Sequence, residues 1–185
     1  MALKATVFRA ELQLSDMDRH YYATHALTLA RHPSETDERL MVRLLAFALY
    51  ADERLEFGRG LSSDDEPDLW LKSRSGEIEL WIDLGQPDDS RIRKACGRSQ
   101  QVVVINYSGR GADIWWDKIA PSLTRCGNLT VIDIAADTVA ELAALADRGM
   151  RLQCMIQDGH VELYGEGSSV TVQQTLRMAP TARAA

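Results

Sequence analysis

The sequence predicts a mixed α/β fold: a central mixed β-sheet flanked by helices, with a β-hairpin towards each end of the chain. Three observations support this prediction. Runs rich in β-branched residues alternate with segments that carry helix-capping and turn residues. The apolar runs 101–107 and 129–134 are each followed by a helical segment, as in parallel strands with right-handed crossovers. The 185 residues, 45% hydrophobic and 26% charged, suit one well-buried domain.

The expected elements follow from alternation, capping residues and turn dipeptides. Residues 1–165 are expected to form the single domain, and residues 166–185 a polar, partly disordered tail. A long helix is expected to begin at a Ser34 cap and to run to about Phe57, where Gly58 closes it. The other expected strands are 3–14, 21–31, 150–157, 160–164 and 170–178, and the other helices begin near 86 and span 109–120 and 137–147.

The stretch 66–85 predicts a β-hairpin with a two-residue turn at Ser75-Gly76. Closing the turn there sorts the side chains into an aliphatic face and a face with charged and aromatic pairs, which stabilises such a register. The expected pairs are Arg74 with Glu77, Lys72 with Glu79, Leu71 with Leu80, Trp70 with Trp81 and Leu69 with Ile82.

One step further, this register sets Asp68 opposite Asp83. Like charges about 5 Å apart destabilise a hairpin. Three explanations stay open: a cation lies between the carboxylates, one of them is protonated, or the strands separate before that point. Oxygen ligands of this kind suit a hard divalent ion such as Mg²⁺.

Composition excludes several classes of protein. The net charge of −6 argues against a generic nucleic-acid coat protein, which would be basic. No apolar run approaches the roughly 18 residues that span a membrane, and the first residues lack a signal-peptide core. The three cysteines, Cys96, Cys126 and Cys154, form neither a zinc spacing nor a disulfide framework. We therefore expect a cytoplasmic protein with reduced thiols and no membrane partner.

Further charged residues extend the candidate site. Glu38 lies on the apolar face of the first helix, where it either complements the helix dipole or acts as a further metal-binding carboxylate. Arg91, Lys94 and Arg98 form a basic face on the helix that follows Gly85. A carboxylate-bound Mg²⁺ or Mn²⁺ with cations beside it suits a phosphate ester.

Pro67-Asp68, a hairpin and then Asp83 resemble the PD-(D/E)xK nuclease signature, and residues 15–70 and 91–107 closely resemble the YaeQ family. The resemblance extends to about Tyr164 and implies a variant restriction-endonuclease-like core. It assigns Asp68 and Asp83, with a supporting Glu38, to the metal. Gly85 stands where the signature has lysine, and Lys94 is the candidate replacement.

Two hypotheses follow. The first is a Mg²⁺-dependent nuclease acting on DNA or RNA, in which Glu38, Asp68, Asp83 and Lys94 are catalytic and Arg91 and Arg98 bind phosphate. The second is a catalytically inactive nuclease-fold protein that binds nucleic acid or a protein partner. The sequence sets neither the oligomeric state nor the substrate.

Overall fold

Two β-sheets organise the chain, and each belongs to its own compact unit. Unit 1 contains residues 1–49 and 137–173, and unit 2 contains residues 50–136 and 174–185. The computed structural model describes residues 4–181. The sequence predicts one central mixed sheet; the structure contains two mixed sheets flanked by helices. The predicted α/β class is therefore confirmed, and the predicted single sheet is wrong.

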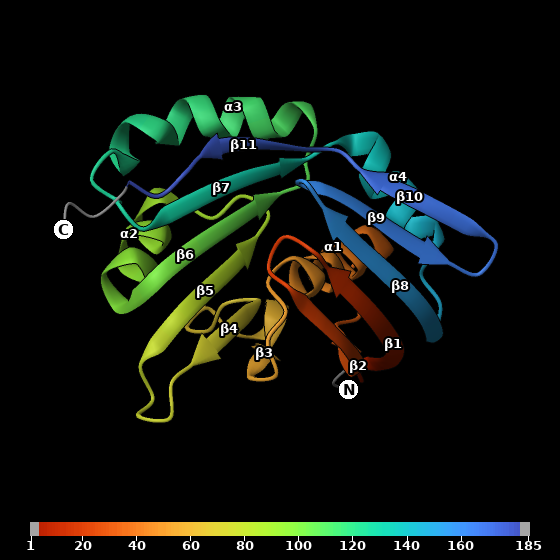
Figure 1. Ribbon diagram of the computed structural model, residues 1–185. Helices are drawn as coiled ribbons and strands as arrows, with labels where there is room; N and C mark the ends of the chain where they lie inside the picture. The colour runs from red at the N-terminus through yellow and green to blue at the C-terminus, as the bar shows by residue number, and fades with distance from the viewer. Residues whose placement is uncertain (1–3, 182–185) are drawn as a thin grey trace. The chain divides into compact units, whose positions relative to one another are not determined.

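Unit 1 is built on a five-stranded sheet in the order β10-β9-β8-β1-β2 (Figure 1). Its strands are β1 Thr6–Asp16, β2 Tyr21–Arg31, β8 Gly149–Gln157, β9 His160–Gly165 and β10 Ser168–Val172. The β1–β2 and β8–β9 hairpins form where predicted, although β1 continues to Asp16 and not to Leu14, and residue 3 of the predicted strand lies outside the described residues. Strand β1 pairs with β8 in parallel. The N-terminal and C-terminal hairpins thus share one sheet, because a parallel pair can join segments that are distant in sequence.

Helix α1, Asp37–Leu49, corrects the predicted first helix at both ends. The side chain that caps it belongs to Thr36, whose Oγ1 accepts the Arg39 N–H at 3.2 Å, and the Ser34 hydroxyl hydrogen-bonds to His32 instead. The predicted end at Phe57 is wrong because 55–57 form strand β3, whose pairing with β4 replaces helical hydrogen bonds. Unit 1 also contains helix α4, Ala136–Ala144, except for its first residue.

Unit 2 is built on a six-stranded sheet in the order β11-β7-β6-β5-β4-β3. Its strands are β3 Leu55–Phe57, β4 Leu69–Lys72, β5 Ile78–Leu84, β6 Ser99–Asn106, β7 Leu129–Ile134 and β11 Gln174–Met178. Its helices are α2 Asp89–Arg98 and α3 Arg110–Ile119, with short 3₁₀ turns at Gly60–Ser62 and Ala120–Leu123. Strands β5, β6 and β7 are parallel, as the apolar runs predict.

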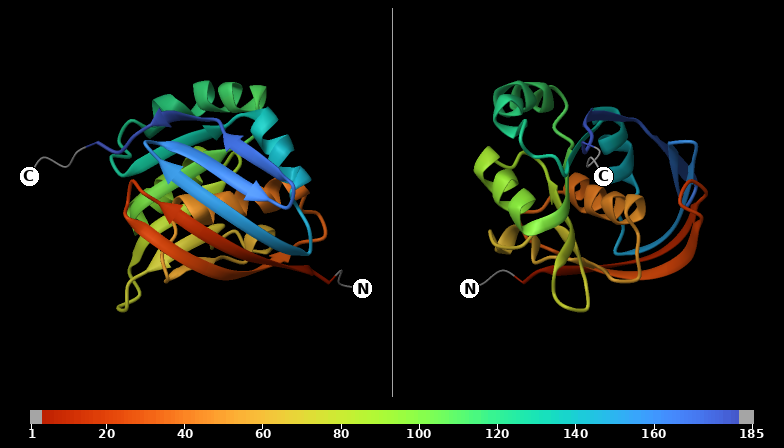
Figure 2. Two further views of the ribbon diagram at one scale, coloured as in Figure 1. Left: turned by 45° about the vertical axis from the view of Figure 1, so that its right-hand side comes forward. Right: turned by 60° about the vertical axis from the view of Figure 1, so that its left-hand side comes forward.

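Helices α2 and α3 cover the same face of the six-stranded sheet (Figure 2). Ile92 and Ala95 of α2 pack with Trp115 of α3 against Val102 and Val104 of β6. Trp115 is buried in this core, and Trp116 is partly exposed beside it. This packing sets the start of α2 beside the end of β5.

The β4–β5 hairpin keeps only the centre of its predicted register. The pairs at Leu69, Trp70 and Leu71 are confirmed, but Lys72 pairs with Ile78, so Glu79 is an extra residue in β5. The predicted Lys72–Glu79 and Arg74–Glu77 pairs are wrong. The turn is longer than two residues because Ser73 N–H donates to Glu77 O at 2.8 Å, and the Ser73 hydroxyl accepts the Glu77 N–H.

The C-terminal segment contains regular structure where a partly disordered tail is predicted. Residues 168–172 form β10 at an edge of the first sheet, and residues 174–178 form β11 at an edge of the second. The predicted single strand at 170–178 is therefore two strands in different sheets. The last residues of the predicted tail, 182–185, lie outside the described part of the chain. Within the described part, none of the helices combines the length and apolar character that crossing a bilayer requires.

Candidate functional site at the β4–β5 hairpin

The structure buries both predicted acids of the hairpin. Asp68, which immediately precedes β4, is 6% exposed, and Asp83, the penultimate residue of β5, is 2% exposed. Carboxylates are almost never fully buried unless they are paired. The partners of these two residues therefore decide what the site can do.

Asp68 ends the antiparallel ladder and contacts β5 through its side chain. Its N–H donates to Ile82 O at 3.0 Å, while its Oδ2 accepts the Leu84 N–H at 2.8 Å. The carbonyl of Asp68 accepts the Gly58 N–H at 2.9 Å. The regular pairing therefore ends at Leu69–Ile82, and Asp68 stays bonded to β5 outside the predicted register.

A cation also lies at the pair, and it is the guanidinium of Arg91. Arg91 Nε donates to Asp83 Oδ2 at 2.8 Å, and its Nη2 donates to Asp83 Oδ1 at 2.9 Å. Such a two-bond fork is the strongest common pairing of a carboxylate with a cation. The pKa of Arg91 is raised, first by the hydrogen bonds that it donates to Asp83, against the opposing effect of burial, and further by the charges of Asp83, Asp68 and Asp64.

The same guanidinium also hydrogen-bonds to the backbone of the acidic loop 61–66. Its Nη1 donates to Asp64 O at 2.6 Å and its Nη2 to Glu66 O at 2.9 Å. The backbone of Arg91 is held as well, because the N-cap residue Asp88 accepts its N–H at 2.7 Å. Arg91 therefore joins the end of β5, the start of α2 and the loop before β4.

In this arrangement the predicted metal site at Asp68 and Asp83 does not fit a divalent ion. Both oxygens of Asp83 are engaged by Arg91, and Asp68 Oδ2 is engaged by the Leu84 amide. Among the described residues, no set of three or more His, Cys, Asp or Glu side chains is arranged to hold a metal ion. A metal at Asp83 requires that Arg91 first leave its carboxylate.

The other predicted cations lie towards solvent. The side chain of Lys94 is 63% exposed, and its Nζ is 3.9 Å from Asp65 Oδ1. Arg98 is exposed, and its guanidinium carbon is 5.8 Å from the Trp81 ring centroid. Lys72 of β4 lies over Trp70, with its Nζ 3.4 Å from the ring centroid.

The backbone conformation accounts for a glycine at position 85, where the predicted signature would have a lysine. Gly85 has φ +88°, a left-handed conformation that L side chains rarely adopt. Its N–H donates to Ile105 O at 2.9 Å, which fixes this turn at the end of the parallel pair β5–β6. A residue with a side chain is therefore strained at the position that the signature assigns to lysine.

Glu38 belongs to unit 1, whereas the two aspartates belong to unit 2. Its side chain is exposed on the first turn of α1. Its predicted part in the site stays a prediction. The buried acid of this region is Glu35, which is 4% exposed and pairs with Arg39 at 3.0 Å and Arg43 at 2.8 Å. The spacing of Arg39, four residues after Glu35, was a signal for this cluster.

The feature missing from the sequence prediction is the Asp83–Arg91 pair. The prediction assigned Arg91 to phosphate because three cations recur along α2. A sequence signal was present: a short connection returns the first turn of α2 to the end of β5, eight residues after Asp83. An arginine there can reach the strand it has just left.

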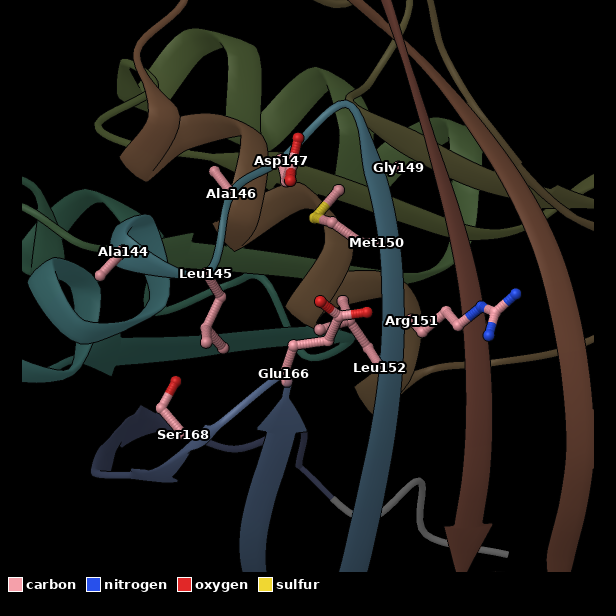
Figure 3. Close-up of a pocket in the computed structure, with 11 residues that line it drawn as sticks. Ala144, Leu145, Ala146, Asp147, Gly149, Met150, Arg151, Leu152, Glu166 and Ser168 are labelled. Carbon is pink, nitrogen blue, oxygen red and sulfur yellow. The ribbon is translucent and has the colours of Figure 1, made fainter.

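Unit 1 contains a separate pocket of about 250 Å³ between the end of α4, the start of β8 and the β9–β10 turn (Figure 3). Its charged side chains diverge: Arg151 extends away from the pocket, whereas Glu166 lies over Leu152. Asp147 Oδ1 accepts the Arg148 N–H at 2.6 Å. This pocket brings together fewer interacting charges than the hairpin of unit 2.

Fold and site define a mixed α/β protein with two mixed sheets flanked by helices and a buried carboxylate–guanidinium cluster. The chain belongs to the YaeQ family, whose family model, described as YaeQ protein, matches residues 1–174. It is 45% identical to "Uncharacterized protein YaeQ" of Escherichia coli (strain K12) over 181 residues, 98% of this chain and 100% of that protein. The Salmonella typhi protein of the same description is 46% identical over the same length.

Two solved structures share this fold. The crystal structure of YaeQ protein from Xanthomonas axonopodis pv. citri matches with a TM-score of 0.93 and 61% identity, covering 95% of this chain and 99% of that chain. The crystal structure of YaeQ protein from Pseudomonas syringae matches with a TM-score of 0.91 and 35% identity, covering 95% and 97%. The family assignment made from the sequence is therefore confirmed.

Proposed function

We propose that this chain is a nuclease-like protein of the PD-(D/E)xK type that binds nucleic acid as a regulatory module and does not cleave it. The observation that carries the proposal is the fork between Arg91 and Asp83. The guanidinium supplies the positive charge that a catalytic metal would supply at these carboxylates. Two further contacts from Arg91 to backbone carbonyls add to the cost of displacing it.

The surface proposed to meet the nucleic acid is the exposed basic face of α2. Arg93 and Lys94 have side chains that are 54% and 63% exposed, and Arg98 is exposed on the same helix. Their acidic neighbours Asp89 and Asp65 are themselves exposed, at 38% and 88%, so water and salt weaken these pairs. Phosphates could therefore compete for the three cations at low ionic strength.

Cleavage and binding are measured on the same preparation. The full chain is incubated with single-stranded, double-stranded and branched DNA and RNA over a range of Mg²⁺ and Mn²⁺ concentrations. We expect no product beyond that of the Asp83→Ala variant. In fluorescence anisotropy, we expect labelled oligonucleotides to bind with an affinity that falls with salt and falls further in Lys94→Gln and Arg98→Gln.

The matched control for these variants is Lys118→Gln, which removes an exposed cation of α3 in the same unit. If Lys118→Gln weakens binding as much as Lys94→Gln, α2 is not the nucleic-acid surface. If the wild type cleaves and both Asp83→Ala and Lys94→Ala abolish cleavage, the proposal of a non-cleaving module is wrong.

Metal-dependent phosphodiester hydrolysis is the second candidate function. It is favoured by two buried carboxylates that act on one guanidinium whose side chain is still 28% exposed. A phosphate bound beside α2 could draw Arg91 away from Asp83 and leave that carboxylate for Mg²⁺ or Mn²⁺. This candidate predicts that the wild type takes up the metal only when an oligonucleotide is present.

Calorimetry separates the two candidates. Mn²⁺ is titrated into the wild type, into Asp68→Asn, into Arg91→Gln and into Arg91→Gln combined with Asp68→Asn, with and without an uncleavable oligonucleotide. Metal binding by the wild type that requires the oligonucleotide, and that disappears in Asp68→Asn, supports hydrolysis. Metal binding by Arg91→Gln alone supports an arginine that permanently replaces the metal. If Arg91→Gln binds Mn²⁺ equally well whether or not it also carries Asp68→Asn, the ion binds elsewhere.

A further inference from the structure

A row of side chains crosses the six-stranded sheet on the face that α2 and α3 cover. Trp70 of β4 pairs with Trp81 of β5, and Trp81 pairs with Val102 of β6. On its other side, Trp70 pairs with Glu56 of β3. Exposure increases outwards along the row, because Trp81 is 3% exposed, Trp70 partly exposed and Glu56 exposed. Trp70 therefore lies where the helical cover of the sheet ends.

The two indoles contact each other, and each has a cation beside its ring. The ring centroids of Trp70 and Trp81 are 6.3 Å apart at an interplanar angle of 83°, which is an edge-to-face arrangement. The Nζ of Lys72 is 3.4 Å from the Trp70 centroid. The guanidinium carbon of Arg98 is 5.8 Å from the Trp81 centroid. Both distances are within the range at which a cation is attracted to an aromatic ring.

Acidic side chains do not neutralise these two cations. Glu79, the predicted partner of Lys72, instead meets Arg54 with both of its carboxylate oxygens. Within the part of the chain that the structure describes, neither Lys72 nor Arg98 forms an ion pair with a carboxylate. Their positive charges are therefore available to an anionic ligand that also makes contact with an indole.

We propose that Trp70 is a stacking platform for an unpaired base of a single-stranded nucleic acid, an inference that rests on the proposed function. The base replaces the Lys72 ammonium on the Trp70 ring, and the ammonium moves to a neighbouring phosphate. Stacking of a base on an aromatic ring is stronger than an exposed cation–π contact, so this exchange is favourable. Arg98 binds a phosphate on the α2 side of the platform.

The platform selects unpaired strands over duplexes. In a duplex each base is already stacked between its neighbours, whereas an unpaired base offers a free ring face to an indole. Every base has such a face, so the platform should tolerate any sequence. Glu56 lies on the β3 side of Trp70 and repels phosphate, so we expect the strand to run from Trp70 towards α2.

The test compares two labelled probes by fluorescence anisotropy on the full chain. One is a single-stranded oligonucleotide of about twelve nucleotides, and the other is an abasic strand of the same length and charge. We expect the wild type to bind the probe that carries bases about tenfold more tightly than the abasic probe. Both probes are made as DNA and as RNA, and a tenfold difference in only one of them identifies that nucleic acid as the ligand.

The two probes also separate this inference from the proposed function. If the wild type binds both probes equally, stacking is wrong, and binding through the cations of α2 stands. If it binds neither probe, the proposed function is wrong, and this inference falls with it.

A matched pair of tryptophan variants tests the position of the platform. Trp70→Leu should bind both probes as weakly as the wild type binds the abasic probe. Trp116→Leu, which removes a partly exposed tryptophan of α3 in the same unit, should keep the tenfold difference. Loss of the difference in Trp116→Leu as well would overturn the assignment to Trp70.

Intrinsic fluorescence gives a second measurement with a milder variant. Binding of the probe that carries bases should quench the tryptophan emission of the wild type, and a duplex of the same sequence should not. Trp70→Phe keeps an aromatic ring in the core and should lose this quenching. Quenching that is undiminished in Trp70→Phe would show that the base stacks on another tryptophan.

The cation of the platform is tested through the salt dependence of binding. Lys72→Gln should reduce the slope of log affinity against log salt concentration by about one, for both probes. Arg74→Gln, which removes an exposed cation at the turn of the same hairpin, should leave the slope unchanged. An equal reduction in both variants would overturn the phosphate contact assigned to Lys72.

Discussion

The two hairpins β4–β5 and β8–β9 follow the same rules of pairing but differ in how far those rules hold. In β8–β9 the pairing is regular along the hairpin, including Ile156 with Val161 and Gln157 with His160 at the Asp158-Gly159 turn. In β4–β5 only three central pairs survive, and the ladder departs from regular pairing at both ends. At each departure, a charged residue of the hairpin has a partner outside it.

At the turn end of β4–β5 that partner is Arg54, whose guanidinium meets both oxygens of Glu79 at 3.0 and 3.2 Å. At the open end the partners are Arg91, for Asp83, and Gly58, for the carbonyl of Asp68. In β8–β9 the outside partner is Asp18, which accepts the Asp158 and Gly159 N–H groups at the turn and leaves the pairing regular. In β4–β5 the outside partners bind acidic side chains of the strands themselves, and regular pairing ends where they do so.

Removing the external cation should break the open end of β4–β5 and leave β8–β9 unaffected. In Arg91→Ala the Asp83 carboxylate stays buried without its partner, and we expect the free energy of unfolding to fall by roughly 4 kcal/mol. Urea denaturation measures the loss. The control is Arg93→Ala, which removes an exposed i,i+4 pair and should cost less than about 1 kcal/mol. Equal losses would mean that the fork does not hold the hairpin.

Gly58 tests the same end of the hairpin through the backbone. A Cβ at Gly58 would lie 1.9 Å from the carbonyl oxygen of Pro67, so Gly58→Ala must separate β3 from the segment leading into β4. We expect a loss of roughly 3 kcal/mol in the free energy of unfolding, at the upper end for overpacking. Hydrogen exchange should show that the Leu84 amide, donor to Asp68, loses protection while β8–β9 does not.

Gly97→Ala is the matched control for that variant. Outside its own helix backbone and chain neighbours, no atom lies within 4 Å of a Cβ at Gly97, the penultimate residue of α2. Alanine there should stabilise the chain by about 0.5 kcal/mol, the lower end for a glycine in a helix, because the residue lies in the last turn. A destabilising Gly97→Ala would show that α2 does not tolerate substitution in general.

The same contrast separates what the sequence could and could not predict. Strand β2 at 21–31, strand β7 at 129–134 and the β8–β9 register follow from alternation and turn residues that are neighbours in sequence. The end of α1 at Leu49 does not, because it depends on β3 finding β4. Pattern rules describe local preference, and tertiary pairing overrides it.

The candidate site shows the same division. The burial of Asp68 and Asp83 agrees with their place beside the aliphatic face of the hairpin. The fork from Arg91 was not predicted, since Arg91 also contacts the carbonyl of Asp64, 27 residues earlier in the chain. Periodicity along a helix finds a basic face, but it does not say which cation turns inward to a buried acid.

Alkaline pH should weaken the regular hairpin through Cys154 of β8. Burial, and then the charge of Asp16, raises the pKa of its thiol to about 12 from an ordinary value of 9.0. A raised pKa means that this stabilisation is present below pH 9 and is lost as pH rises towards 12. With reductant present, the wild type should lose roughly 2 kcal/mol more between pH 8 and pH 11 than Cys154→Ala does. If the free energies of unfolding of the wild type and Cys154→Ala fall equally with pH, the pKa of Cys154 is not raised in the folded state.

Placing a lysine at position 85, where the proposed signature would have one, gives the smallest expected effect and bears most directly on the irregular hairpin. Gly85 follows β5 with φ +88°, and the nearest atom to its Cβ position, Tyr107 Cε1, is 4.0 Å away. Gly85→Lys therefore introduces backbone strain without a steric clash. It should lower the free energy of unfolding by roughly 1 kcal/mol, measured by thermal denaturation. Gly85→Asn should cost less because asparagine tolerates this conformation. If a non-cleaving module results from Arg91 occupying Asp83, Gly85→Lys alone should produce no cleavage with Mg²⁺ or Mn²⁺, since the added lysine leaves that fork intact. Cleavage by Gly85→Lys would instead identify the missing lysine, and not the arginine, as what keeps this site inactive.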